Sequence, residues 1–262
     1  MMKPPCEREQ LRREISVFSR SLMLSARVAE LCETEATPRQ EEFLNRVLGE
    51  EMARRERSKK SRLLNRAGFP VCKSFDDYDF ADIRLPPAFG QDELLSCRFI
   101  NEKKNLVLYG GVGTGKTHMA IALGISACEQ GCAVRFFTVT ELVLRLSDAY
   151  RNGTLERLVR DLKQLDLLIL DEWGYVPVDR EGSQLLFRVI ADSYESKSLI
   201  LTTNLEFSKW GGIFTDEQMA AAMIDRLVHH GHLIMFEAKS YRMTHALMRH
   251  SAAPKSAARK EA

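Results

Sequence analysis

The sequence predicts an α/β fold, in which a parallel β-sheet carries helices on both faces and follows a small helical domain. Four short and mostly apolar runs, at residues 106–108, 133–138, 165–171 and 199–203, are typical of strands that are buried on both faces. Segments with helical apolar spacing lie between these runs. Strands that alternate with helices in this way form a doubly wound parallel sheet.

The glycine-rich loop after the first run fits a phosphate-binding pattern at each fixed position. Gly110, Gly115, Lys116 and Thr117 match G-x-x-x-x-G-K-[ST], which predicts a fold of the P-loop kind. The backbone N–H groups point at phosphate oxygens, the lysine reaches the β- and γ-phosphates, and the threonine hydroxyl ligates Mg²⁺. A glycine-rich turn without a ligand is the alternative, but the strand before and the amphipathic helix after it favour nucleotide binding. The predicted ATP-binding residues are Gly110, Gly111, Val112, Gly113, Thr114, Gly115, Lys116, Thr117 and His118.

Two acidic residues, Asp171 and Glu172, close the third apolar run. Ligands of such sheets bind at the carboxyl ends of the strands, so both carboxylates are expected beside the phosphates. Asp171 is predicted to hold Mg²⁺ together with Thr117, and Glu172 to orient and polarise the attacking water. Two acids that merely cap a strand in a turn are the alternative. A metabolic kinase has little use for the second acid, because its nucleophile is the substrate, so the pair favours hydrolysis.

Two more polar residues are candidates for the same site. Asn204 follows the fourth run, where a side chain can hold the attacking water or touch the γ-phosphate. Arg226 lies on a helix expected over residues 216–229. It is either a surface arginine paired with Asp225 or Glu217, or a finger donated to the nucleotide of a neighbouring subunit. Spacing alone does not choose between the two.

Size and composition fit one large domain with a small appendage. The chain has 262 residues, a net charge of +2 and 45% hydrophobic residues. Its six cysteines form no C-x-x-C pair, and the sequence shows no secretory signal and no apolar run that could span a membrane, so we expect a cytoplasmic protein with reduced thiols. The expected parts are a basic helical domain at residues 1–68, a linker at 69–90, the nucleotide-binding core at 91–250 and a disordered tail at 251–262.

A long helix of the N-terminal domain carries a dense basic run. Thr37, Pro38 and Gln40 fit a capped helix start, and Gly68 with Pro70 predicts the end of the helix. Because the net charge of the chain is small, any affinity for nucleic acid must come from such local patches. A solvated helix face is the alternative to a site for nucleic acid or an acidic partner.

Together these motifs resemble the IstB/DnaC group of AAA+ ATPases, and they are most similar to IstB-like transposition helper ATPases. The resemblance covers about residues 40–248. It implies an AAA+ core that uses ATP and Mg²⁺, with Arg226 as the finger acting between subunits and Arg242 as a second, sensor-type arginine. The matching stretches are residues 110–117, 167–174, 202–205, 208–210, 224–230 and 240–242.

The resemblance also implies a function. It predicts ATP-dependent assembly of a homo-oligomer on duplex DNA, and help to or regulation of the transposase that the same insertion sequence encodes. The alternatives are a replicative helicase loader with single-strand preference, and a metabolic P-loop kinase. Bending duplex DNA costs several kcal/mol, roughly, so many contacts must offset it. Candidate DNA contacts are Arg54, Arg55, Arg57, Lys59, Lys60, Arg62, Arg145, Tyr150, Arg151, Arg157 and Tyr175.

Overall fold

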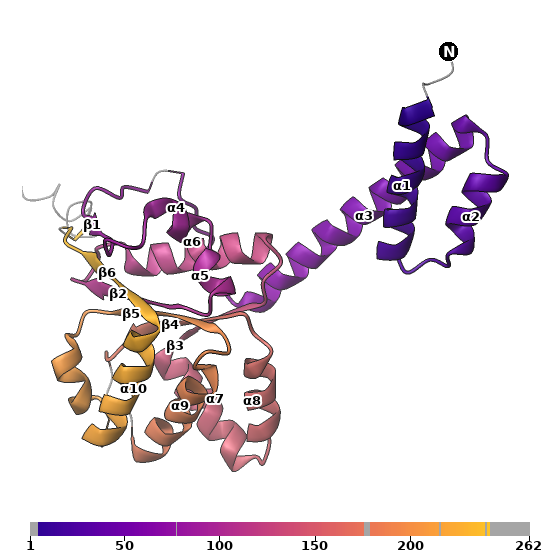
Figure 1. Ribbon diagram of the computed structural model, residues 1–262. Helices are drawn as coiled ribbons and strands as arrows, with labels where there is room; N and C mark the ends of the chain where they lie inside the picture. The colour runs from indigo at the N-terminus through magenta and orange to yellow at the C-terminus, as the bar shows by residue number, and fades with distance from the viewer. Residues whose placement is uncertain (1–4, 77, 176–178, 215, 239, 242–262) are drawn as a thin grey trace, which may run out of the picture. The chain divides into compact units, whose positions relative to one another are not determined.

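The computed structural model describes residues 5–76, 78–175, 179–214, 216–238 and 240–241 (Figure 1). The chain divides into two compact units, residues 1–62 and residues 63–262. Within the described residues, no helix is both long and apolar enough to cross a lipid bilayer.

The N-terminal unit consists of α1 (Pro5–Ser21), α2 (Arg27–Thr34) and most of α3 (Pro38–Ala67). Its small apolar core contains Ile15, Leu22, Cys32 and Leu48. The carboxylate of Glu41 is fully buried and forms ion pairs at 2.8 Å with both Arg8 and Arg12 of α1. These two guanidinium groups hold the pKa of Glu41 below its usual range. Side-chain ion pairs therefore fasten α1 to the start of α3.

Both ends of α3 agree with the capping signals of the sequence. At its start, the Gln40 side-chain oxygen accepts hydrogen bonds of 2.8 Å from both the backbone N–H and the hydroxyl of Thr37. At its end, Gly68 follows with a φ of 78°, the left-handed conformation that commonly terminates helices. The helix runs from Pro38 to Ala67, as these signals predict.

The second unit is built on a six-stranded sheet in the order β1-β6-β2-β5-β4-β3. The four predicted strands are β2 (Asn105–Gly110), β3 (Val134–Thr138), β4 (Leu167–Trp173) and β5 (Ser198–Thr203), and they pair in parallel. Two further strands were not predicted from the sequence: β6 (Gly231–Phe236), which is parallel to β2, and the short antiparallel edge strand β1 (Ile83–Arg84). The observed fold is the predicted one, with two further strands on one side.

Helices cover both faces of this sheet (Figure 1). One face packs against α6, with α4 and α5 beside it, and the other face against α7, α9 and α10. The 3-10 helix η1 (Phe207–Gly212) contributes Trp210 to the apolar core between the sheet and α7, α9 and α10, where the ring centroids of Trp210 and Trp173 lie 5.1 Å apart. The bounds are α4 (Gln91–Leu95), α5 (Arg98–Asn101), α6 (Lys116–Glu129), α7 (Val139–Arg151), α8 (Leu155–Lys163), α9 (Arg180–Ser193), η1 (Phe207–Gly212) and α10 (Glu217–His229).

We expect a buried lysine between α9 and β5 to make the stability of this unit depend on pH. Lys197 is 2% exposed and its ammonium donates a hydrogen bond to the Leu162 carbonyl. Burial lowers the pKa of Lys197 from 10.5 to about 8. Between these two pH values the unfolded chain keeps a proton that the folded chain has released, so stability rises with pH.

Replacing Lys197 by methionine removes this titration. From pH 7 to pH 10 we expect the free energy of unfolding of the wild type to rise relative to that of Lys197→Met, by roughly 1–3 kcal/mol. Urea titrations of both proteins at the two pH values measure the difference, and other titrating groups cancel in the comparison. A difference that stays constant with pH would show that the folded state keeps Lys197 charged.

Candidate nucleotide site

The phosphate loop lies between the end of β2 and the start of α6, where close backbone contacts require glycine. A side chain at Gly110 would place its Cβ 2.5 Å from the Phe236 carbonyl oxygen of the neighbouring strand. Gly115 has a φ of 99° and precedes the first turn of α6, and a Cβ there would lie 3.0 Å from the Tyr78 hydroxyl. These glycines therefore allow the tight turn that aims backbone N–H groups and the positive end of α6 at one point.

The ammonium of Lys116 lies inside this loop. The residue is buried, and its Nζ donates hydrogen bonds of 2.8 Å to the Gly110 carbonyl and 2.6 Å to the Gly111 carbonyl. The positive charge is thus held beside the backbone that would surround the phosphates. This position fits a cation that moves from loop carbonyls to phosphate oxygens when a nucleotide binds.

Thr117 and Asp171 come together as the sequence predicts. The Thr117 hydroxyl donates a hydrogen bond of 2.9 Å to Oδ1 of Asp171, and Asp171 is only 5% exposed. A hydroxyl oxygen next to a carboxylate is the kind of hard oxygen donor set that Mg²⁺ prefers. The two residues therefore fit the metal ion that the phosphate loop implies.

A β-bulge at the end of β4 presents the two acidic residues. Leu170 pairs with Leu201 and Trp173 pairs with Thr203, so Asp171 and Glu172 together face one residue of β5. Glu172 is in the left-handed region with a φ of 62°, which is uncommon for residues other than glycine and typical of functional sites.

The extra residue changes where the side chains go. Asp171 is buried beside Thr117, Glu172 is exposed, and Trp173 joins the core on the opposite face of the sheet.

Thr202 is the residue of β5 that faces the bulge, and it was not among the site residues predicted from the sequence. Its hydroxyl donates a hydrogen bond of 2.5 Å to Oδ1 of Asp171 and accepts one of 3.0 Å from the backbone N–H of Glu172. Thr202 is 2% exposed. The hydroxyl residues at the end of β5, which follow its apolar residues 199–201 and lie next to the strand that carries the two acids, are the signal that could have identified it.

The two outer candidates of the site lie at different edges of the sheet. Asn204 directly follows β5, so it lies at the carboxyl edge, next to the end of β4. Arg226 lies in the last turn of α10, just before β6 begins at Gly231. Because β6 runs parallel to β2, this is the amino edge of the sheet, opposite the phosphate loop.

Arg226 is held by its own subunit at that edge. Its Nη1 donates a hydrogen bond of 3.0 Å to the Ala222 carbonyl, and its guanidinium carbon lies 5.2 Å from the centroid of the Phe187 ring on α9. In the part of the chain that the structure describes, Arg226 forms no ion pair with Asp225 or Glu217. The first alternative for this residue, a surface ion pair, therefore finds no support.

The C-terminal segment reaches the phosphate loop. The backbone N–H of Tyr241 donates a hydrogen bond of 2.9 Å to the Gly113 carbonyl. Arg242, the predicted sensor-type arginine, lies outside the described residues, as does the predicted tail at 251–262. The chain therefore approaches the nucleotide site one residue before Arg242.

The segment predicted as a linker packs on the start of α6. The Tyr78 hydroxyl donates a hydrogen bond of 3.2 Å to the Gly115 carbonyl, and burial raises the pKa of Tyr78. His118, a predicted nucleotide contact, lies 4.9 Å from the Tyr78 ring between centroids, and its Nε2 is 2.7 Å from the Ser74 carbonyl. Since that carbonyl can only accept, Nε2 carries the proton. His118 is thus oriented by the linker.

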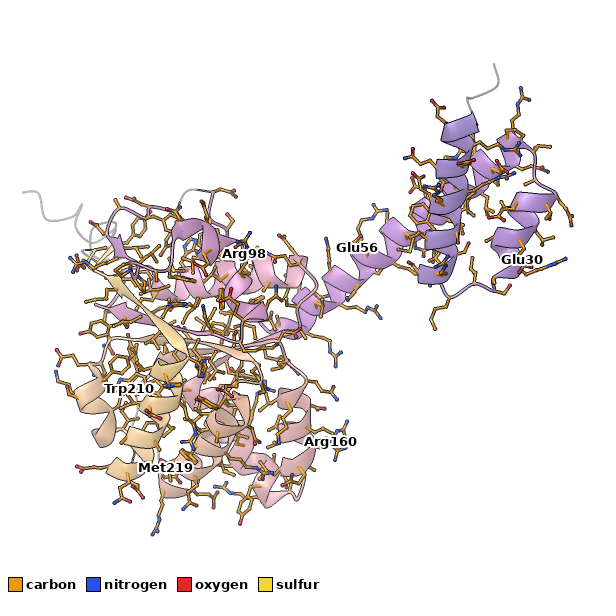
Figure 2. All side chains as sticks on the ribbon, viewed as in Figure 1. Glu30, Glu56, Arg98, Arg160, Trp210 and Met219 are labelled. Atoms are coloured by element: carbon orange, nitrogen blue, oxygen red, sulfur yellow. The ribbon has the colours of Figure 1, made fainter. Side chains whose placement is uncertain are left out.

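The candidate DNA contacts fall into two sets, one in each unit. On α3 the basic side chains are exposed or half-buried, and two of them pair with acids of the same helix, Arg55 with Glu51 at 2.8 Å and Lys60 with Glu56 at 3.5 Å. Figure 2 labels Glu56, the acidic partner of Lys60 on α3. The members of this set are Arg54, Arg55, Arg57, Lys59, Lys60 and Arg62.

The second set lies mainly on α7 and α8. Arg145 and Arg157 line one cavity of about 450 Å³ between these helices, together with Asp148 and Asp161. Arg145 also pairs with Glu141 at 2.8 Å. The other members are exposed: Arg151, Tyr150 and, after β4, Tyr175. Acidic residues are thus interspersed among the basic residues of this surface.

Comparison with known proteins places this architecture in a family. The family model of IstB-like ATP binding proteins matches residues 21–249. The insertion sequence IS21 putative ATP-binding protein of Pseudomonas aeruginosa is 38% identical over 206 residues, which cover 77% of this chain and 76% of that protein. The corresponding IS5376 protein of Geobacillus stearothermophilus is 37% identical over 77% of this chain and 80% of its own length.

Comparison with solved structures gives two similarities. A crystal structure of the DnaC helicase loader superposes with a TM-score of 0.50 at 21% identity, and covers 67% of this chain and 98% of that one. The similarity to AMPPCP-bound DnaA from Aquifex aeolicus has a TM-score of 0.48 and 24% identity, and spans 56% of this chain and 45% of that one. The fold is that of AAA+ P-loop ATPases, and the chain belongs to the family of IstB-like ATP-binding proteins.

Proposed function

We propose that this protein hydrolyses ATP, assembles as a homo-oligomer on duplex DNA, and helps or regulates the transposase of an insertion sequence. The observation that carries the proposal is the bulge at the end of β4. It presents an exposed carboxylate, Glu172, next to the buried pair of Thr117 and Asp171. A protein that only binds ATP has no need of a second carboxylate held in a strained backbone conformation.

Each residue of the site then has a defined task. The loop N–H groups and Lys116 bind the phosphates, and Thr117 with Asp171 would hold Mg²⁺. When bound, Mg²⁺ supplies neutralisation of the charge that develops on the β- and γ-phosphate oxygens. Glu172 orients a water molecule in line with the γ-phosphate and accepts its proton. Asn204, at the same edge of the sheet, is placed to hold that water or a γ-phosphate oxygen.

The position of Arg226 supports a role between subunits. Because it lies at the amino edge of its own sheet, opposite the phosphate loop, it is poorly placed to reach the nucleotide of its own subunit. In an oligomer the same edge can face the nucleotide of the next subunit. Arg226 would then supply the charge that stabilises the transition state, and hydrolysis would depend on assembly.

The DNA and transposase parts of the proposal rest on relatives and on charge. The similar proteins are described as insertion-sequence ATP-binding proteins. The basic residues of α3 provide a dense set of cations on one helix, which fits contact with phosphates. The mixed charges between α7 and α8 fit such a contact less well. A helicase loader is the second candidate, since the DnaC fold superposes on this chain.

ATP turnover by the wild-type protein distinguishes these functions. We expect slow hydrolysis without DNA and stimulation by duplex that is larger than stimulation by single strands of the same length. The stimulation should fall steeply when salt is raised from about 50 to 200 mM, because phosphate contacts release counterions. Stimulation by single strands alone would favour a helicase loader, and no turnover under any of these conditions would contradict the proposal.

A further inference from the structure

We propose that Thr202 is a positioning residue for ATP hydrolysis, because its single hydroxyl sets the geometry of both acidic residues at the end of β4. The inference rests on the proposed hydrolytic function. Thr202 faces the bulge alone, since Leu201 and Thr203 on either side of it pair with Leu170 and Trp173. On the β5 side of β4, the group that holds the bulge from within the sheet therefore comes from this position, while Thr138 of β3 is in register with Asp171 on the other side.

The hydroxyl is used in both directions. It donates to Oδ1 of Asp171 at 2.5 Å and accepts from the backbone N–H of Glu172 at 3.0 Å. The second bond holds Glu172 in its left-handed conformation with a φ of 62°. The bulge interrupts the regular pairing of β4, so the Glu172 N–H needs another acceptor, and the Thr202 hydroxyl is that acceptor. The Thr202 side chain thus holds two groups: the carboxylate of Asp171, which is expected at the metal ion, and the backbone of Glu172, whose carboxylate is expected at the water.

Thr117 is the other residue whose hydroxyl bonds to the same carboxylate oxygen, but Thr202 alone of the two also bonds to the Glu172 backbone. Thr117 also donates to Oδ1 of Asp171, at 2.9 Å. Thr117 donates to Asp171 and still has lone pairs that can bind a metal ion, whereas the hydroxyl of Thr202 lies in the sheet and bonds on one side to Asp171 and on the other to the backbone N–H of Glu172. We therefore infer that Thr202 holds Asp171 in the same orientation before and after the metal ion binds.

The test compares Thr202→Val, which keeps the shape and removes the hydroxyl, with Thr202→Ser, which keeps the hydroxyl. Thr202→Ala, which adds no bulk, is measured beside them in case the valine variant does not fold. Ser198→Ala is the matched control, because it removes another buried hydroxyl of β5 that bonds to the Phe99 carbonyl at the far end of the strand. Thermal unfolding establishes that each variant is folded.

Two readouts separate positioning from a general loss of stability. We expect Thr202→Val to lower kcat about 10- to 100-fold and to weaken the Mg²⁺ dependence of activity by a similar factor. In calorimetric titrations, ATP affinity without Mg²⁺ should stay within about 3-fold of the wild type, while the gain in affinity on adding Mg²⁺ should shrink. Thr202→Ser and Ser198→Ala should both behave like the wild type.

Different results identify different errors. If folded Thr202→Val or Thr202→Ala has the kcat and the Mg²⁺ requirement of the wild type, the positioning role is wrong. A serine variant as impaired as the valine variant would show that the methyl group matters and the hydroxyl does not. If the wild type itself hydrolyses no ATP with Mg²⁺ and duplex DNA, the proposed function fails, whatever Thr202 does.

Discussion

Arg226→Ala should lower ATP turnover on duplex DNA by about 10³-fold or more, while ATP affinity stays unchanged. The expected loss is large because an arginine finger stabilises charge that exists only in the transition state. Within its own subunit Arg226 contacts the Phe187 ring and the Ala222 carbonyl, and it lies at the edge of the sheet opposite the phosphate loop. Turnover and ATP binding are measured in the same preparations. Arg188→Ala is the control, since Arg188 pairs on the surface with Glu156 at 2.9 Å.

A mixing experiment shows whether Arg226 acts across subunits. Asp171→Ala subunits lack a working hydrolytic site but keep their arginine, and Arg226→Ala subunits keep the site. Mixed in equal amounts on duplex DNA, the two inactive proteins should recover part of the wild-type turnover. If the mixture stays as inactive as its components, Arg226 does not serve a neighbouring site.

Glu172→Gln should lower ATP turnover by about 10² to 10⁴, which is the range for loss of a general base. The substitution keeps the size of the side chain and the hydrogen bond from the Glu172 backbone to Thr202. ATP binding should therefore stay within about 3-fold, because Lys116 and the loop N–H groups are untouched. Glu206→Gln, an exposed acid that pairs with Lys209, provides the control. Turnover at the wild-type rate would mean that another group activates the water.

The sequence was sufficient to predict those elements that depend on residues close together in the chain. The phosphate loop has fixed spacing, and the strands β2, β3, β4 and β5 are short apolar runs that only a sheet covered on both faces can bury. The bounds of α3 also follow from neighbouring residues, Thr37 and Gln40 at the start and Gly68 at the end. Each of these features depends on a few residues that are close together in the chain.

The bulge and its partner depend on residues far apart in the chain. Whether Asp171 and Glu172 face the same residue is decided by the register of β4 against β5, about 30 residues later. In the structure the bulge also changes which residues of β4 face the core between the sheet and α7, α9 and α10. The residues of β4 that belong to this core are Leu168, Leu170 and Trp173, so the alternation of faces along the strand shifts by one residue after Leu170. Because residues 167–170 are all apolar, the sequence alone does not show which of them face the same side, and the shift becomes visible only in the structure.

The edge strands and the arginine show the same limit. β6 follows α10 closely and begins with Gly231 and His232, which are not residues with a high strand propensity. Without β6, the helix before it has no fixed direction relative to the sheet. Without that direction, the edge of the sheet at which Arg226 lies is undetermined, so the sequence spacing alone could not distinguish a surface ion pair from a role at a neighbouring subunit.

Assembly of Glu172→Gln on DNA tests the central claim most directly, since this variant should bind ATP and keep it. Particle mass would be measured with labelled duplex or single strand of equal length, with ATP or ADP, over a range of salt concentrations. The account predicts a large particle only with ATP and duplex, and its steep loss as salt rises. Complexes that have the same mass with ADP as with ATP, or that form only on single strands, would contradict it.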